Sequence, residues 1–169
     1  MKTIFISLGG NLENTQDIFH ELYPEIEKNI GIIQKFSSIY QTAAWGFKKQ
    51  PDFLNQVLKI KSRIDSPGEI LRIVLQMEKN SGRIRKEKWG PRIIDIDILF
   101  IEDEVIHLND LIIPHPYIQE RRFILIPFKE IEEDFIHPVF NKTIDKLYLE
   151  TKDNSEVIIK SPPPIDFNY

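Results

Sequence analysis

The interpretation of this chain starts from residues 82–100, which are Gly82-Arg83-Ile84-Arg85-Lys86-Glu87-Lys88-Trp89-Gly90-Pro91-Arg92-Ile93-Ile94-Asp95-Ile96-Asp97-Ile98-Leu99-Phe100. Isoleucine alternates with aspartate in the second half, and β-branched residues at a period of two predict a strand. Successive strand side chains point to opposite faces, so Asp95 and Asp97 lie on one face with Cα atoms ~7 Å apart. Two carboxylates this close repel each other unless a cation binds between them. Oxygen ligands without a nearby His or Cys favour Mg²⁺.

Five cations lie just before this strand, with Trp89 among them: Arg83, Arg85, Lys86, Lys88 and Arg92. Guanidinium groups bind phosphate oxygens bidentately. Phosphate-binding cations beside Mg²⁺-binding carboxylates are typical of transfer from a nucleoside triphosphate. The alternative is a solvated strand face that follows an ordinary lysine-rich loop. Long apolar runs flank the aspartates, and a buried carboxylate pair needs compensation, so the combination favours a site.

Length and composition limit the classes of protein to consider. At 169 residues we expect a single domain over 1–169, with a core of about 1–140 and a C-terminal extension of 141–169. A net charge of −4 argues against a nucleic-acid partner, and the chain has no cysteine for disulfides or thiolate metal sites. No apolar run approaches the ~20 residues of a membrane span. The N-terminus leads directly into a strand without a signal peptide, so we expect a cytoplasmic protein.

The periodicity of apolar residues predicts an α+β fold. Gly9-Gly10 is interpreted as a structural turn after the first strand that could line the site from below, and Ser66-Pro67-Gly68-Glu69 as a capped helix start. Strand, helix, strand, strand, helix, strand is the order of a ferredoxin-like βαββαβ core, here with appended C-terminal elements in an αβα three-layer arrangement. The predicted elements are strand 3–8, helix 14–29, strands 32–42 and 53–64, helix 66–81, the Asp95–Asp97 strand, strand 105–107, a short helix that follows 121–128 and includes Ile131, helix 144–149 and strand 157–159.

Several motifs fall into one register and together resemble the 6-hydroxymethyl-7,8-dihydropterin pyrophosphokinase family. The resemblance runs from roughly Ile4 to Phe128. The Trp-Gly-Pro-Arg run followed by Asp-x-Asp is its most specific part. The motifs are Ser7-Leu8-Gly9-Gly10-Asn11-Leu12, Thr42-Ala43-Ala44-Trp45-Gly46, Gln50-Pro51-Asp52-Phe53-Leu54-Asn55, Gly82-Arg83-Ile84-Arg85, Trp89-Gly90-Pro91-Arg92, Asp95-Ile96-Asp97-Ile98, Pro114-His115-Pro116 and Glu120-Arg121-Arg122-Phe123.

The resemblance implies a folate-biosynthesis enzyme that transfers pyrophosphate from ATP to the hydroxymethyl oxygen of a dihydropterin and releases AMP. By resemblance, Asp95 and Asp97 hold two Mg²⁺ ions, and Arg83 and Arg92 complete the catalytic set by holding phosphates. The implied nucleotide-binding residues are Arg83, Arg85, Trp89, Arg92, Ile98, His115 and Arg121. Arg85 is equally well interpreted as a solvated loop cation. Without the register, His115 is a turn residue between prolines, and His137 is interpreted as structural.

For the pterin, the resemblance implies a sandwich between Phe53 and Phe123, with its edge bound by Asn55 and the Thr42 backbone. An amide offers both a donor and an acceptor, which suits that edge. The alternative for both phenylalanines is ordinary core packing. The implied pterin-binding residues are Thr42, Ala43, Trp45, Phe53, Asn55, Trp89, Asp95 and Phe123.

Three places depart from the family pattern. Ala43-Ala44 stands where proline is common, and Lys88 stands where an arginine is frequent. Asp110 and Ile112 stand where some members carry Arg and Thr near the nucleotide.

A ferredoxin-like RNA-binding module with Phe53 and Phe123 as stacking platforms is the second hypothesis. A non-catalytic small-molecule sensor is the third. We expect a monomer whose partners are its small-molecule substrates, with neither nucleic acid nor membrane.

Overall fold

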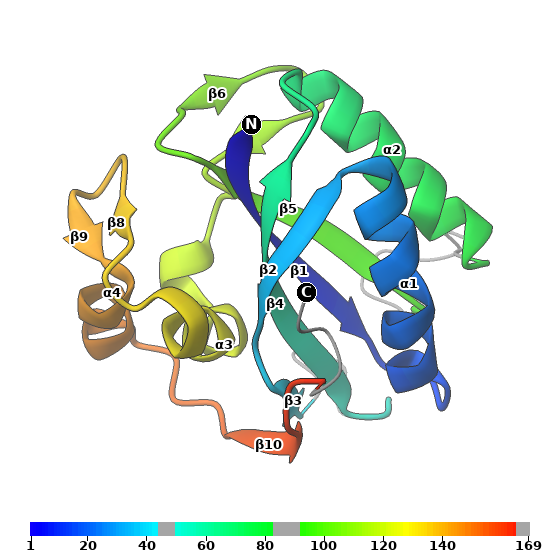
Figure 1. The fold of residues 1–169 in the computed structure, drawn as a ribbon. Coiled ribbons are helices and arrows are strands. Elements are labelled where there is room, and N and C mark those ends of the chain that lie inside the picture. The colour runs from blue at the N-terminus through cyan, green and yellow to red at the C-terminus, as the bar shows by residue number, and fades with distance from the viewer. Residues whose placement is uncertain (44–49, 83–91, 165–169) are drawn as a thin grey trace.

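The computed structural model describes residues 1–43, 50–82 and 92–164 and shows a mixed α/β fold (Figure 1). Its main sheet has six strands in the order β10-β3-β4-β1-β5, with β2 also paired to β4. Every strand pair in this sheet is antiparallel. The expectation of strands mixed with helices is confirmed. The main-sheet strands are β1 Lys2–Gly10, β2 Gly31–Phe36, β3 Ile39–Thr42, β4 Phe53–Ser62, β5 Asp95–Ile101 and β10 Val157–Ser161.

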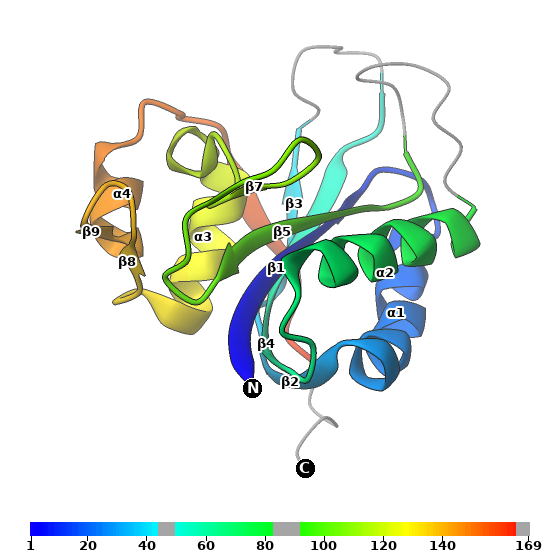
Figure 2. The same cartoon turned by 90° about the horizontal axis from the view of Figure 1, so that it is seen from above.

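The helices cover both faces of this sheet. In Figure 2, α1 and α2 lie on one side and α3 and α4 on the other. The helices of the described residues are α1 Thr15–Asn29, α2 Pro67–Asn80, α3 Arg122–Glu132, α4 Ile144–Glu150 and the 3₁₀ turn η1 Ile118–Glu120, and the short strand pairs are β6 Ile106–His107 with β7 Ile112–Ile113 and β8 Ile136–His137 with β9 Lys142–Thr143.

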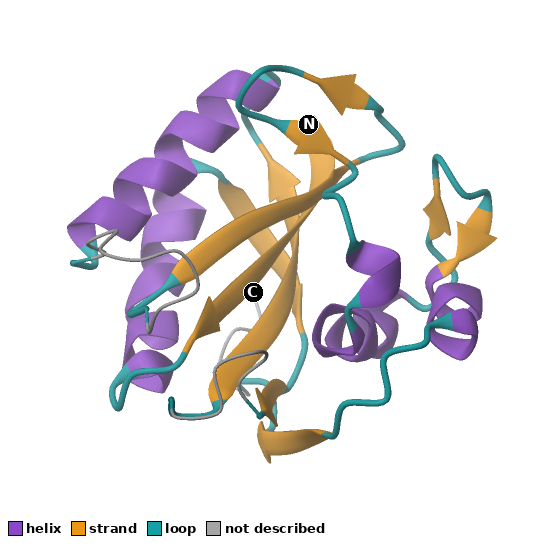
Figure 3. Ribbon diagram, turned by 180° about the vertical axis from the view of Figure 1, so that it is seen from behind, coloured by secondary structure: helices purple, strands orange, loops and turns teal. Residues whose placement is uncertain are grey.

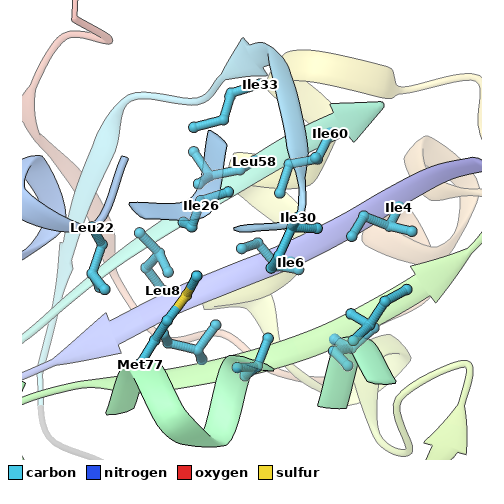
Figure 4. Close-up of a cluster of buried hydrophobic side chains, with 14 of the residues drawn as sticks. Ile4, Ile6, Leu8, Leu22, Ile26, Ile30, Ile33, Leu58, Ile60 and Met77 are labelled. Carbon is cyan, nitrogen blue, oxygen red and sulfur yellow. The ribbon is translucent and has the colours of Figure 1, made fainter. Parts of the chain in front are cut away.

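The core between the sheet and α1/α2 is mainly aliphatic and follows the alternation of β1. Ile4, Ile6 and Leu8 are fully buried, because every second side chain of a strand points to the same face. They pack near Ile26 of α1 and Met77 of α2 (Figure 4). Ser66 begins α2 as predicted, since its side chain accepts a hydrogen bond from the Glu69 N–H at 3.4 Å.

The opposite core is aromatic. The Phe5 ring lies 4.6 Å from that of Phe128 on α3, and Phe100 lies edge-on to both at 6.3 and 5.4 Å. Ile98 pairs with Ile6 while Phe100 pairs with Phe5, so Leu99 is an extra residue in β5. This β-bulge lets Leu99 and Phe100 both join the aromatic core. The residues before the bulge keep a strict alternation, which decides where the aspartates point.

The single strand predicted over 32–42 is divided in the structure. β2 ends at Phe36 and β3 begins at Ile39. Between them the Ser37 hydroxyl accepts a hydrogen bond from the Val57 N–H at 2.9 Å, and the Gln56 side-chain amide donates to the Ser37 carbonyl at 2.9 Å. Side chains therefore take over hydrogen bonds that a regular ladder would make, and the strand is interrupted.

The C-terminal residues return to the main sheet, because β10 pairs with β3 and the two strands align Val157 with Thr42 (Figure 3). Within the described parts of the chain, no helix is both long enough and apolar enough to cross a membrane.

His137 has the structural environment predicted for it and generates a prediction. Its Nδ1 accepts hydrogen bonds from the Val139 and Phe140 N–H groups at 3.2 and 3.4 Å, and burial lowers its pKa to about 4. The unfolded chain takes up this proton near pH 6.5, so between pH 6.5 and 4 unfolding is favoured as the pH falls. We expect the free energy of unfolding to drop by up to ~3 kcal/mol over this window from His137 alone.

The control is His137→Asn, whose side-chain oxygen can accept the same hydrogen bonds but does not titrate. Denaturant unfolding at pH 7, 5.5 and 4 should show a shallower pH dependence in the variant. Equal slopes for the two proteins would contradict the assignment of this pH dependence to His137.

Candidate active site

The candidate site begins with three residues aligned across the sheet on its α3 side. Gly9 of β1 pairs with Asn55 of β4 on one side and with Asp95 of β5 on the other. Directly paired antiparallel residues place their side chains ~4.5–5.5 Å apart. A Cβ built on Gly9 would lie 3.5 Å from Asn55 Oδ1 and 4.0 Å from Asp95 Cβ. Gly9 therefore leaves a shallow floor between an amide and a carboxylate.

This position corrects the interpretation of Gly9 as part of a turn. β1 continues through Gly10, so Gly9 lies within a strand and lines the candidate site. A glycine inside a strand often marks a place where another group approaches the backbone closely. That signal was present in the sequence, but the neighbours of Gly9 are known only from the strand register.

Asp97 lies one step further along the same face, since it pairs with Ser7 of β1. Ile96 and Ile98 alternate with the aspartates and are buried in the aliphatic core on the other face. The prediction that the two aspartates share a face is confirmed. The side chain of Ile98 points away from this face, so only its backbone could contact a nucleotide here.

The two carboxylates have different neighbours. The Arg92 guanidinium donates a hydrogen bond to Asp95 Oδ2, and the two form an ion pair. Asp97 Oδ1 lies 3.9 Å from Nε2 of His115, and the backbone N–H of His115 donates to the Leu99 carbonyl at 2.9 Å. Burial lowers the pKa of His115 against the opposing pull of Asp97. The imidazole is therefore neutral at pH 7, and its contact with Asp97 is not an ion pair.

Two predicted aromatic rings lie on the α3 side of the sheet, one on β4 and one on α3. The Arg92 guanidinium carbon lies 5.8 Å from the centroid of Phe53, which is two residues before Asn55 and on the same face of β4. Phe123, at the start of α3, packs against the aromatic core, and Arg121 lies 5.8 Å from its ring. Both rings are half-buried, so the core-packing alternative describes Phe123 only in part.

Asn55 is held by β3. Its Nδ2 donates to the Thr42 hydroxyl at 3.0 Å, and both side chains are buried. Ala43, which follows Thr42, is exposed. Contacts therefore join Thr42 to Asn55, Arg92 to Asp95 and Phe53, and His115 to Asp97. Four other predicted site residues lie outside the described residues: Trp45, Arg83, Arg85 and Trp89.

Paired carboxylates beside an arginine that can reach phosphate are typical of phosphoryl transfer, and half-buried rings can stack on a flat aromatic substrate. Comparison with known proteins agrees. The model of the 7,8-dihydro-6-hydroxymethylpterin-pyrophosphokinase family matches residues 5–133. The chain belongs to this family.

Two relatives illustrate the similarity. The 2-amino-4-hydroxy-6-hydroxymethyldihydropteridine pyrophosphokinase of Aquifex aeolicus is 40% identical over 144 residues, which cover 85% of this chain and 89% of the relative. The Bacillus subtilis protein of the same name is 37% identical over 128 residues, 75% of this chain and 76% of its own length. The predicted family and its activity in folate biosynthesis are thereby confirmed. These matches favour the enzyme over the two alternatives, an RNA-binding module and a non-catalytic sensor.

Solved structures support the fold independently. The wild-type HPPK-DHPS of Plasmodium falciparum superimposes with a TM-score of 0.73 over 88% of this chain at 19% identity. The match spans 44% of that longer chain. At this identity the likeness concerns the fold alone.

Gly9→Ala tests the floor of the site. The added methyl group meets its neighbours at ordinary van der Waals distances, so we expect the free energy of unfolding to stay unchanged or rise slightly. We expect pterin affinity to fall on the order of tenfold (~1.4 kcal/mol), because the methyl group occupies the space between Asn55 and Asp95. Direct binding measurements with the pterin would check this.

The matched control is Gly68→Ala in the first turn of α2, where an added Cβ meets nothing within 4 Å. Its pterin affinity should equal that of the wild type. Unchanged affinity in Gly9→Ala would show that the pterin does not lie on this floor.

Proposed function

We propose that the α3-side face of the sheet transfers a pyrophosphoryl group from Mg²⁺-bound ATP to 6-hydroxymethyl-7,8-dihydropterin. The observation that supports this most directly is the alignment of Asn55, Gly9 and Asp95 in one row, with Asp97 beside it. In this row Asn55, the proposed ligand of the pterin edge, lies across Gly9 from Asp95. Family membership supports the same reaction.

The residues present fit Mg²⁺. Among the described residues no group of three or more His, Cys, Asp or Glu side chains could hold a metal, so the chain supplies a carboxylate pair rather than a full cage. Mg²⁺ commonly binds one or two carboxylates together with substrate phosphates and water. Asp95 and Asp97 would hold it in this way, with two ions when ATP is present. Bound Mg²⁺ supplies neutralisation of the phosphate charge and polarisation of the attacking oxygen.

The chain's own residues position the reactants. The hydroxymethyl oxygen forms a bond to the β-phosphorus of ATP, the bond from this phosphorus to the α–β bridging oxygen breaks, AMP leaves, and the hydroxyl proton passes to solvent. Arg92 exchanges its partner Asp95 for phosphate oxygens, where its planar guanidinium can bind bidentately. Asn55 binds the pterin edge while Thr42 fixes its amide. Phe53 and Phe123 cover the ring, and neutral His115 and Arg121 contact the nucleotide.

The finer description of fold and assembly is also a proposal. With β2 and β3 counted as one interrupted strand, the order of the main sheet supports a ferredoxin-like core to which β10 is added. A monomeric enzyme is proposed as well, since the proposed roles need no residue from a second copy.

Formation of AMP tests the reaction. Purified protein with ATP and Mg²⁺ should release AMP only when 6-hydroxymethyl-7,8-dihydropterin is added. Asp97→Asn should lower turnover by at least about 10³-fold, since a metal-held phosphate loses a charged ligand worth several kcal/mol. Mg²⁺-dependent binding of a non-hydrolysable ATP analogue should weaken in parallel, which measures the metal site without catalysis.

Asp103→Asn is the control, because Asp103 lies in the turn after β5 and outside the candidate site. Its turnover should match the wild type. Near-normal turnover in Asp97→Asn would remove this carboxylate from the metal site, and AMP release without pterin would contradict the proposed acceptor.

Phe123→Leu tests the ring cover. Leucine keeps an apolar contact with the aromatic core but loses the flat surface, and stacking of a base on an aromatic ring is worth roughly 1–3 kcal/mol. We expect pterin affinity to fall ~10- to 100-fold by direct titration. Tyr117→Leu is the matched control, since Tyr117 lies 5.8 Å from the same Arg121 guanidinium. An equal loss of pterin affinity in both variants would show that the loss comes from a change at Arg121 and not from the missing Phe123 ring.

A further inference from the structure

Asn11, the residue after β1, has a buried side chain whose oxygen and both N–H groups form hydrogen bonds. It is 2% exposed. Its Oδ1 accepts a hydrogen bond from the Arg92 N–H at 2.9 Å, and its Nδ2 donates to Gln50 Oε1 at 3.2 Å and to the Pro51 carbonyl at 3.3 Å. A side-chain amide offers one acceptor oxygen and two donor hydrogens, and all three have partners here.

Asn11 binds both the backbone N–H and the backbone carbonyl of Arg92. Besides the bond to Oδ1, the Asn11 N–H donates to the Arg92 carbonyl at 3.1 Å. Gly10 permits this close approach, because a Cβ at that position would lie 2.5 Å from the Ile93 carbonyl oxygen. The end of β1 therefore fixes the backbone from which the Arg92 guanidinium reaches Asp95 and the Phe53 ring.

The other two bonds of the amide reach the residues that lead into β4. Pro51 is two residues before Phe53, and Phe53 lies under the Arg92 guanidinium. One buried amide thus joins the segment that carries Arg92 to the segment that carries Phe53. A shorter side chain at this position could not make the connection, because the three bonds use the oxygen and both hydrogens of the amide.

We propose that Asn11 is a positioning residue that acts through Arg92, holding its backbone so that the guanidinium meets the transferred phosphates. The proposal rests on the phosphate-binding role proposed for Arg92. Asn11 does not itself touch a substrate. Its contribution should therefore depend on the presence of the Arg92 side chain.

A purely structural role for Asn11 in the turn after β1 is the competing explanation. The same turn is held by Thr15, whose hydroxyl donates to the Leu12 carbonyl at 2.7 Å and accepts from the Leu12 N–H at 3.1 Å. Thr15 is fully buried, and its hydrogen bonds are to Leu12 rather than to Arg92. Thr15→Val therefore weakens the turn while it leaves the connection to Arg92 intact.

The test is a double-mutant cycle with Asn11→Ala, Arg92→Ala and the double variant, measured as kcat and KM for both substrates. We expect Asn11→Ala to lower kcat at least about tenfold, with KM for ATP and pterin within about threefold of the wild type. In the Arg92→Ala background, which keeps the backbone groups that Asn11 binds, the same substitution should lower kcat no further.

Two controls complete the design. Gln50→Ala removes one partner of the Asn11 amide but leaves its bonds to Arg92, and Thr15→Val weakens the turn. Both should keep kcat within about twofold of the wild type even if denaturant unfolding shows a loss of stability. If Asn11→Ala does not fold, Asn11→Leu, which has nearly the same size without polar atoms, replaces it in the cycle.

The outcomes separate this inference from the proposed function. Wild-type kcat in Arg92→Ala would contradict the role of Arg92 and, with it, any action of Asn11 through Arg92. A strong loss in Arg92→Ala together with multiplicative effects in the double variant would overturn the inference alone. So would unchanged kcat in Asn11→Ala, or an equal loss of kcat in Thr15→Val or Gln50→Ala.

Discussion

The candidate site depends on the register with which β1 pairs to both of its neighbours. Because β1 is hydrogen-bonded to β4 on one side and β5 on the other, the position of Gly9 determines which residues of the other two strands meet across it. A slip of one residue in either pairing would turn Asp95 or Asn55 toward the aliphatic core. The buried Leu58 and Ile60 of β4, and Ile96 and Ile98 of β5, oppose such a slip, since it would move them out of the aliphatic core and bury polar groups instead. The hydrophobic core therefore also specifies the geometry of the polar face.

Local sequence patterns predict part of this geometry. Period-two alternation predicts that Asp95 and Asp97 share one face of a strand. A capping pattern likewise predicts Ser66 as the N-cap of α2, because both features depend only on neighbouring residues. The interruption at Ser37 was not predictable in this way. It depends on hydrogen bonds to Gln56 and Val57, which are distant in sequence. The roles of Gly9 and Asn11 likewise arise from partners in other segments, although both lie in a motif that resembles the family.

The ion pair between Arg92 and Asp95 connects the electrostatics of the site to its proposed chemistry. Both side chains are about one-quarter exposed, so each loses part of its hydration and the pair compensates that loss. If Asp95 binds a cation and Arg92 binds phosphate, each group exchanges one charged partner for another, and neither is left uncompensated at the end. The ion pair therefore holds both groups near their proposed working positions and reduces the repulsion between the two carboxylates.

The C-terminal strand β10 also supports the candidate site, although it lies outside the residues that the family model matches. The family model matches residues 5–133, whereas β10 covers Val157–Ser161. β3 has only four residues, of which three pair with β4, and such a short edge strand gains little stability from one neighbour. Pairing with β10 gives β3 a second neighbour and places Thr42 between Phe53 on one side and Val157 on the other. Since Thr42 holds the Asn55 amide, the last strand of the chain supports the same row of residues that β1 organises from the centre of the sheet.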